Sequence, residues 1–215
     1  MARYYNIFYY YILIFRGIHT PHNIINTIKE HKMKNIFILF QVCIFSGIIA
    51  LASALLNNNI MNKLGNADPE KVQKLFYGVA FISGLTAPLA IIFVFYIFFI
   101  LTAKLQVIMS DHLRKEIFSI ATIAYLPILF GTLINFILSL TFGFTDFGYI
   151  TAYGIFEPEN KILVHLTQEL NPFKIIAIAI ACYLYVSTYN KNKKTFWILF
   201  ITWYFINLLL VALLG

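Results

Sequence analysis

Residues 36–56 read IFILFQVCIFSGIIALASALL and contain no charged side chain. A helix needs about 20 apolar residues to cross the hydrocarbon core of a bilayer, and this stretch supplies them. Four more apolar stretches follow, at 77–103, 120–142, 173–189 and 196–214, of which the fourth is slightly short. None contains an acidic residue, and Lys174 is the only basic one. The pattern predicts an all-α, polytopic transmembrane bundle with five spans.

Composition supports the same class. Hydrophobic residues make up 60% of the chain and charged residues 12%, whereas soluble domains carry about 25% charged residues. A water-soluble fold would have to bury all five stretches in one core, with few charges to coat its surface. We therefore expect a multi-pass protein of the cell membrane, with the lipid bilayer as its surroundings. No basic cluster is interleaved with aromatic residues, so the net charge of +7 does not indicate nucleic-acid binding.

The 16 lysines and arginines are unevenly placed around the five stretches. The segments that connect the five stretches are assigned to alternating sides of the membrane. Most of the lysines and arginines then lie on the same side as the N-terminus. They include Lys191, Lys193 and Lys194 in the short turn before the last stretch. Basic residues accumulate in loops that remain in the cytoplasm. The distribution therefore predicts a cytoplasmic N-terminus and, after five crossings, an external C-terminus.

The region before the first span has its own pattern. Thr20 and Pro21 form a helix-start signal, because threonine caps helices well and proline suits the first helical position. The following segment, HNIINTIKEHKMK at 22–34, places isoleucines on one side and lysines toward the other. Such a short basic amphipathic helix can rest on an anionic leaflet. We expect residues 1–18 to lie along the membrane surface, with a cleaved signal peptide as the alternative. Residues 1–34 are thus a cytoplasmic or interfacial segment, and residues 35–215 form the five-helix domain.

Apart from Lys174 at the start of the fourth stretch, polar residues within the spans are uncharged. Gln41, Asn135 and Asn207 are the amides at span positions, and such groups contribute about 0.6 kcal/mol each when they bond between helices. Packing is the simpler interpretation, and a binding site built from these three amides is the alternative. The histidines lie outside the spans, and no recognised catalytic or phosphate-binding motif is present. We therefore predict no enzyme activity, no catalytic residue, no cofactor and no metal site.

Two further features predict helix contacts. Ser46, Ala50 and Ala54 recur every four residues in the first stretch, a small-residue stripe that lets another helix approach closely. Pro88 and Pro127 lie inside the second and third stretches, where each removes one backbone hydrogen bond. Together with Tyr125, Asn135 and Asn207, these residues are the candidates for packing or for binding a partner.

Several segments resemble one family. The third stretch, together with the residues just before it, reads KEIFSIATIAYLPILFGTLINFILSL. This segment is similar to the central segment of the Yip (Ypt-interacting-protein) domain family. The matching residues are Phe118, Ala124, Tyr125, Pro127 and Gly131. Asn171–Phe173 and the turn Lys191–Lys194 resemble the fourth span of that family and its basic turn, and TPHNIINTIKEHK resembles the helix before the first span. The resemblance is to the short bacterial type. It implies five spans and an accessory role beside ABC-type exporters or peptide-toxin resistance systems.

Three functions follow from these observations. The favoured one is a non-enzymatic scaffold or accessory subunit that binds other membrane proteins or copies of itself. The alternative is a small transporter or an oligomeric channel, suggested by the span prolines and amides. A third is an intramembrane enzyme acting on lipid, with its site near Asp111, His112 and Glu116.

Overall fold

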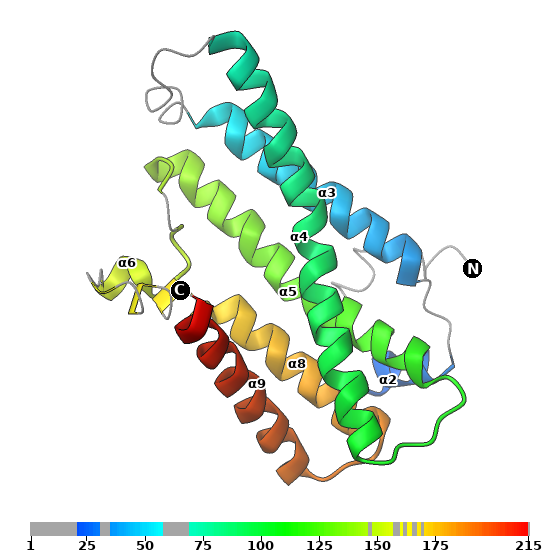
Figure 1. Cartoon of the computed structure of the whole chain (residues 1–215). Coiled ribbons are helices and arrows are strands. Elements are labelled where there is room, and N and C mark those ends of the chain that lie inside the picture. Colours follow the sequence, from blue (N-terminus) through cyan, green and yellow to red (C-terminus); the bar gives the residue numbers. More distant parts are fainter. Residues whose placement is uncertain are drawn as a thin grey trace.

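A computed structural model describes residues 21–30, 35–57, 69–145, 148–156 and 170–214, together with Asn160, Leu163, Val164, Thr167 and Gln168. Every regular element in these ranges is an α-helix, which confirms the predicted class (Figure 1). The helices are α2 (Pro21–Lys29), α3 (Asn35–Leu56), α4 (Pro69–Leu105), α5 (Leu113–Phe142), α6 (Tyr153–Phe156), α8 (Pro172–Thr188) and α9 (Lys193–Leu214).

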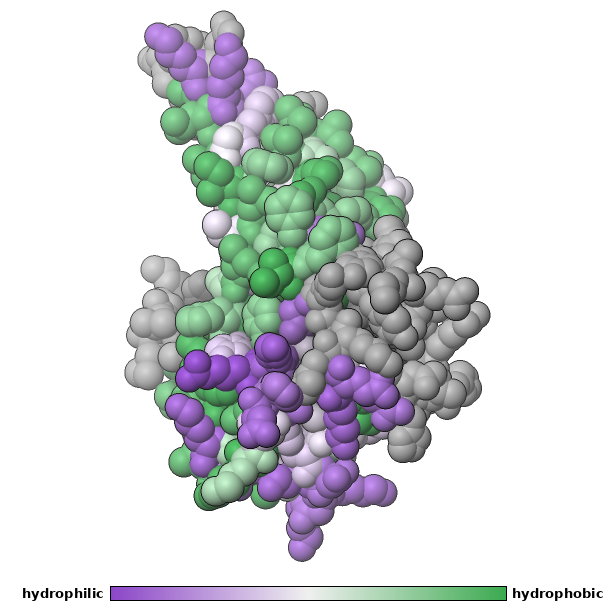
Figure 2. Space-filling model, turned by 90° about the vertical axis from the view of Figure 1, so that its right-hand side faces the viewer, coloured by the Kyte–Doolittle hydropathy of each residue, from purple (hydrophilic) through white to green (hydrophobic). Residues whose placement is uncertain are grey.

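Three of the described helices, α3, α4 and α5, are long and apolar enough to cross a membrane, and α8 is a shorter apolar helix of 17 residues. On the face shown in Figure 2, apolar side chains form a broad band and hydrophilic side chains gather at both ends. Lipid-facing surfaces have this arrangement, because polar groups are costly in hydrocarbon. The prediction of a membrane protein is supported by these helices.

Helix α5 lies at the centre of the bundle. Helices α2, α3, α4 and α8 all pack against it, and Figure 1 shows it running between the α3–α4 pair and the α8–α9 pair. The side chains of Ile117, Ile120, Ala121, Ala124 and Leu126 are fully buried. Much of α3 and α4, in contrast, faces outward. Among the described helices, α5 is therefore the internal one, and α2, α3, α4 and α8 pack around it.

Helices α3 and α4 cross at very close range. A Cβ atom built on Gly84 of α4 would lie 2.6 Å from Cβ of Ala50, 2.9 Å from Cα of Gly47 and 2.9 Å from the carbonyl oxygen of Ser46. Only glycine leaves room for this contact. Ser46 and Ala50 of the predicted small-residue stripe therefore lie against a helix of the same chain, and Ala54 is buried farther along α3.

Helix α2 packs its apolar face against the bundle. Ile24, Ile25 and Ile28 are buried, and α2 packs against α5 and α8. Lys29 remains exposed. The isoleucine face covers the end of the bundle, and it contacts the protein. The prediction for residues 1–18, and the remainder of the 1–34 segment at 19–20 and 31–34, lie outside the described residues.

Helix α4 is longer than its apolar stretch. One helix of 37 residues runs from Pro69 to Leu105, so it covers the apolar stretch at 77–103 and the eight residues before it. Glu70, Lys71, Gln73 and Lys74 in this extension are residues that form helices well. Helix α5 likewise begins at Leu113, ahead of the stretch predicted from 120, and runs through Pro127 for 30 residues.

Candidate functional site

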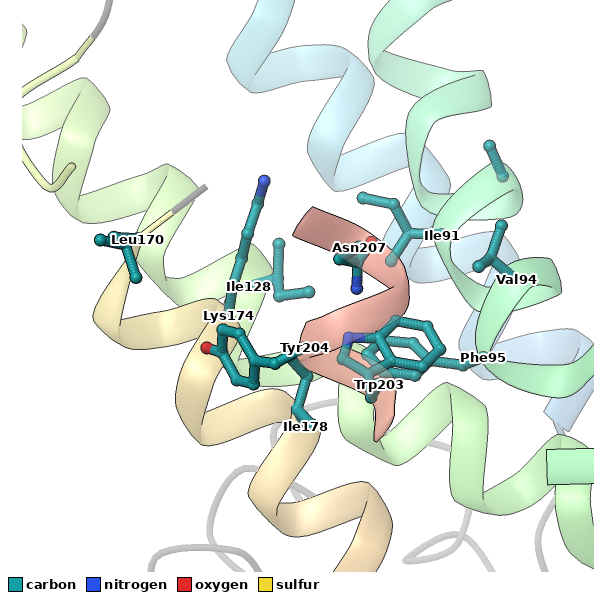
Figure 3. A pocket seen from close by; sticks show the side chains of 11 residues that line it. Ile91, Val94, Phe95, Ile128, Leu170, Lys174, Ile178, Trp203, Tyr204 and Asn207 are labelled. Atoms are coloured by element: carbon teal, nitrogen blue, oxygen red, sulfur yellow. The ribbon is translucent and has the colours of Figure 1, made fainter. Parts of the chain in front are cut away.

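A cavity of about 280 Å³ opens where α4, α5, α8 and α9 meet (Figure 3). Helix α4 contributes Ile91, Val94 and Phe95, and α5 contributes Ile128. Each of these side chains is apolar, so the walls formed by α4 and α5 offer only van der Waals contact. The two helices described next supply its polar atoms.

The start of α8 places a cation in the cavity. Asn171 caps this helix, since its Oδ1 accepts a hydrogen bond from the Phe173 backbone N–H at 2.8 Å, and Pro172 occupies the first turn. Lys174 follows, and both Lys174 and Ile178 line the cavity, four residues apart on one helix face. Asparagine and proline at these positions define where α8 begins. They therefore also set the position of the Lys174 side chain.

Helix α9 supplies the aromatic wall. Trp203 is stacked on Phe95 of α4, with ring centroids 4.6 Å apart, and meets Phe98 edge to face at 5.0 Å. Such pairs add about 0.5–1.5 kcal/mol to the burial of the rings. Asn207 lies one turn farther along and lines the same cavity, together with Tyr204. The aromatic contacts thus join α9 to α4 at the cavity, which Asn207 and Lys174 both line.

The three amides predicted as a possible binding site are not brought together here. Asn207 lines the cavity, but neither Asn135 nor Gln41 does. Asn135 holds the connection after α5, because its Oδ1 accepts the Tyr149 backbone N–H at 2.6 Å. Gly148 has φ of +73°, and a Cβ atom there would lie 2.8 Å from the Asn135 amide oxygen. Asn135 therefore has a structural partner in the chain itself.

A second polar cluster lies at the opposite end of the bundle. Glu116 is only 8% exposed. Its Oε2 accepts hydrogen bonds from the Ser110 hydroxyl at 3.1 Å and from the Tyr189 hydroxyl at 3.0 Å. The Tyr189 ring meets that of Tyr185 at 5.0 Å, and the Tyr185 hydroxyl donates to Gln106 at 3.2 Å. These bonds tie the end of α8 to the α4–α5 connection.

Of the three residues considered for a lipid-acting enzyme, only Glu116 is buried in this cluster. Asp111 and His112 are exposed at the start of α5. The hydrogen-bond partners of Glu116 are the hydroxyl groups of Ser110 and Tyr189. Within the described residues, no group of three His, Cys, Asp or Glu side chains could hold a metal ion.

Replacing Tyr189 with phenylalanine is expected to lower the free energy of unfolding by about 1–2 kcal/mol, because Glu116 loses one of its two hydroxyl donors. Tyr183→Phe is the matched control, since Tyr183 is exposed on the same helix. Thermal unfolding of both variants in mild detergent measures the difference. Equal shifts in the two variants would show that the Tyr189–Glu116 bond does not stabilise the bundle.

The remaining candidates lie in the interior. Tyr125 is buried and its side chain interacts with Ser46, which joins α5 to α3. Pro88 and Pro127 are also buried, in helices that continue on both sides of them. The cavity was not predicted from the sequence. The one sequence feature that pointed to it was Lys174, the only charged residue in any apolar stretch.

No family model, no curated protein and no solved structure matches this chain.

Proposed function

We propose that the chain crosses the cell membrane five times, with its N-terminus in the cytoplasm and its C-terminus outside. The arrangement of charge supports this orientation. Helix α4 ends and α5 begins near Lys104, Arg114 and Lys115. The α8–α9 turn, with Lys191 and Lys193, lies at the same end of the bundle (Figure 1). A basic end of this kind is typical of the cytoplasmic side.

Cysteine labelling tests the orientation. With the buried Cys43 and Cys182 replaced by alanine, single cysteines are introduced at Lys71 and at Lys193. A membrane-impermeant maleimide applied to intact cells is expected to label position 71 and to label position 193 only after lysis. The reverse result would contradict the proposed orientation.

In this membrane we propose a non-enzymatic scaffold or accessory subunit that binds other membrane proteins. The observation that carries the proposal is an apolar groove of about 560 Å³ between α3, α4 and α5, with Leu39, Phe93, Tyr96 and Phe118 among its lining residues. Concave apolar surfaces at membrane depth fit the side chains of another helix, since packing drives helix association in lipid.

Two of the groove residues are also exposed. Leu89 and Phe93 lie four residues apart on α4, line the groove and are 44% and 59% exposed. A partner helix laid in the groove would cover both side chains. The resemblance to the Yip family stays a prediction, and it implies an ABC-type exporter or a toxin-resistance system as the class of partner.

Site-specific crosslinking tests this function. A photoreactive p-benzoylphenylalanine replaces Phe93, which lines the groove and is 59% exposed, or Phe205 on α9, which is 65% exposed. We expect a discrete protein adduct from position 93 and only lipid adducts from position 205. An adduct of twice the chain's own mass would identify a second copy as the partner. Lipid adducts alone at both positions would contradict the scaffold role.

The cavity between α4, α5, α8 and α9 favours a second candidate, a small transporter or oligomeric channel. Sites for solutes in membrane proteins commonly lie between helices and carry a few polar groups. Lys174 and Asn207 are such groups. Reconstituted protein that releases a trapped anion from liposomes, with release lost in Lys174→Gln, would support this candidate over the scaffold.

A further inference from the structure

The α4–α5 connection at 105–112 holds three apolar side chains on its outside. They alternate along the chain and are largely exposed, with Leu105 at 86%, Val107 at 71% and Met109 at 91%. A connection surrounded by water normally shows the reverse, with polar side chains outward and apolar ones turned toward the core. Exposed apolar patches of this kind mark surfaces that contact a partner or a membrane.

The side chains between these three hold the connection against the bundle. Oε1 of Gln106 accepts a hydrogen bond from the Tyr185 hydroxyl of α8 at 3.2 Å. The Ser110 hydroxyl donates to Oε2 of the buried Glu116 at 3.1 Å, and Ile108 packs against the hydrophobic core. Because every second residue is attached to the bundle, the connection presents its three exposed side chains on the opposite side.

Val107 has an outward position that folding alone does not account for. Helix α4 ends with hydrogen bonds from the Val107 N–H to the Lys104 carbonyl at 3.1 Å and from the Ile108 N–H to the Ala103 carbonyl at 3.0 Å. The residue that ends a helix in this way takes a left-handed conformation and is usually glycine. Val107 has φ of +51°, which is unfavourable for a β-branched side chain. Since its side chain is also exposed, it gains no burial in the chain itself in return.

Lipid is the apolar material nearest to this side of the connection. Helix α4 exposes Ile97, Leu101 and Leu105 at four-residue spacing, so one apolar stripe runs along the helix from the span to the connection. Figure 1 shows the connection running along the outer edge of the bundle. Acyl chains that cover Ile97 and Leu101 are therefore continuous with the layer that meets Leu105.

The charges around the connection indicate which lipids it meets. Three exposed cations flank it, Lys104 at the end of α4 and Arg114 and Lys115 at the start of α5. None of the three has an ion-pair partner among the described residues. Asp111 is the exposed carboxylate of the segment 104–115, so the net charge of its surface is positive. Lysine and arginine at the end of a span extend toward the head groups, and such a basic surface is attracted to an anionic leaflet.

We infer that the α4–α5 connection inserts into the leaflet at its end of the bundle and binds anionic lipids there. Val107 and Met109 enter the boundary between head groups and acyl chains, and the three flanking cations pair with head groups of net negative charge. Segments that bind anionic leaflets combine these two features. The inference rests on the placement of the chain in a bilayer. It depends neither on the scaffold role nor on which side of the membrane this end faces.

Fluorescence quenching by lipid tests the insertion. With Cys43 and Cys182 replaced by alanine, a single cysteine is introduced by Met109→Cys and labelled with the fluorophore NBD. The purified protein is placed in phosphatidylcholine nanodiscs that contain a lipid with a nitroxide on its acyl chain. Ile97→Cys, at an exposed position within the span, gives the reference for contact with lipid. Lys71→Cys, at an exposed position before the apolar stretch, gives the reference for water. We expect position 109 to be quenched like position 97 and position 71 to be quenched weakly.

Head-group selection is measured with the same label at position 109. Nitroxide-bearing phosphatidylglycerol and phosphatidylcholine are compared at equal small fractions. We expect the anionic lipid to be enriched beside the label by about two- to five-fold, the range that exposed charge pairs supply. Arg114→Gln/Lys115→Gln is expected to remove most of this excess. Lys74→Gln, a change of charge near the other end of α4, is expected to keep it, and thermal unfolding shows that these variants are folded.

Each contrary result overturns a different part of the inference. Weak quenching at position 109 with strong quenching at 97 would show that the connection stays outside the leaflet, which would leave a protein partner to cover it. Equal quenching by the two nitroxide lipids, or an excess that survives in Arg114→Gln/Lys115→Gln, would contradict the selection of anionic lipids. Weak quenching at both 109 and 97 would show that the placement of α4 in the bilayer is itself wrong.

Discussion

Replacing Gly84 with alanine is expected to lower the free energy of unfolding by about 2–3 kcal/mol, at the upper end of the cost of overfilling a packed interior. The added methyl group would meet Ala50 at 2.6 Å and the backbone of Ser46 and Gly47 at 2.9 Å. Backbone atoms cannot move aside as a flexible side chain can. Helices α3 and α4 would therefore separate along their whole crossing.

Gly78→Ala is the matched control for this prediction. It makes the same chemical change in the same helix, at a position where an added Cβ atom meets nothing within 4 Å. Alanine is favoured over glycine in a helix by up to about 1 kcal/mol, so Gly78→Ala is expected to be neutral or slightly stabilising. Thermal unfolding in mild detergent measures both. Similar melting temperatures for the two variants would contradict the close crossing of α3 and α4.

Gly131→Ala is expected to destabilise the bundle by about 2 kcal/mol, by the same mechanism at a different crossing. An added Cβ atom would lie 2.7 Å from the ring of Phe173 and 2.8 Å from its Cβ atom. Phe173 directly precedes Lys174, so a shift of α8 away from α5 would also displace the cation of the cavity. We expect Gly131→Ala to lower the melting temperature measured in mild detergent.

A double mutant separates this contact from a general loss of helix packing. Phe173→Ala removes the ring that the new methyl group would strike. The combination Gly131→Ala/Phe173→Ala is therefore expected to be less destabilised than the sum of the two single variants. Additive losses would mean that the Gly131–Phe173 contact does not limit the approach of α5 and α8.

Much of the fold could be predicted from hydropathy. The cores of α3, α4 and α5 coincide with the first three apolar stretches, because the length of an apolar run is a local property of the sequence. The ends of the helices could not be predicted as well. Helix α4 extends back to Pro69 through polar residues that form helix readily, and hydropathy does not register such residues. One helix start was predicted from the sequence, with Pro21 at the first helical position, and α2 begins at Pro21.

The sites were less predictable, because they depend on which helices are neighbours. Lys174 stood out as a lone charge, but nothing in the sequence places it near Asn207, 33 positions later, or near Phe95. Tyr189 and Glu116 meet across 73 positions. Asn135 was considered a ligand, yet its partner is a backbone N–H group of the following connection. A hydrogen bond to a backbone N–H group cannot be predicted from residue types, because nearly every residue has such a group.

The unequal lengths of α4 and α8 have a consequence for the surrounding lipid. Helix α4 has 37 residues and α8 has 17, which correspond to about 55 Å and about 25 Å along their axes. In the five-span arrangement proposed above, α8 is shorter than a hydrocarbon core of about 30 Å, so acyl chains beside it would shorten or tilt. Such mismatch costs a fraction of a kcal/mol for each ångström.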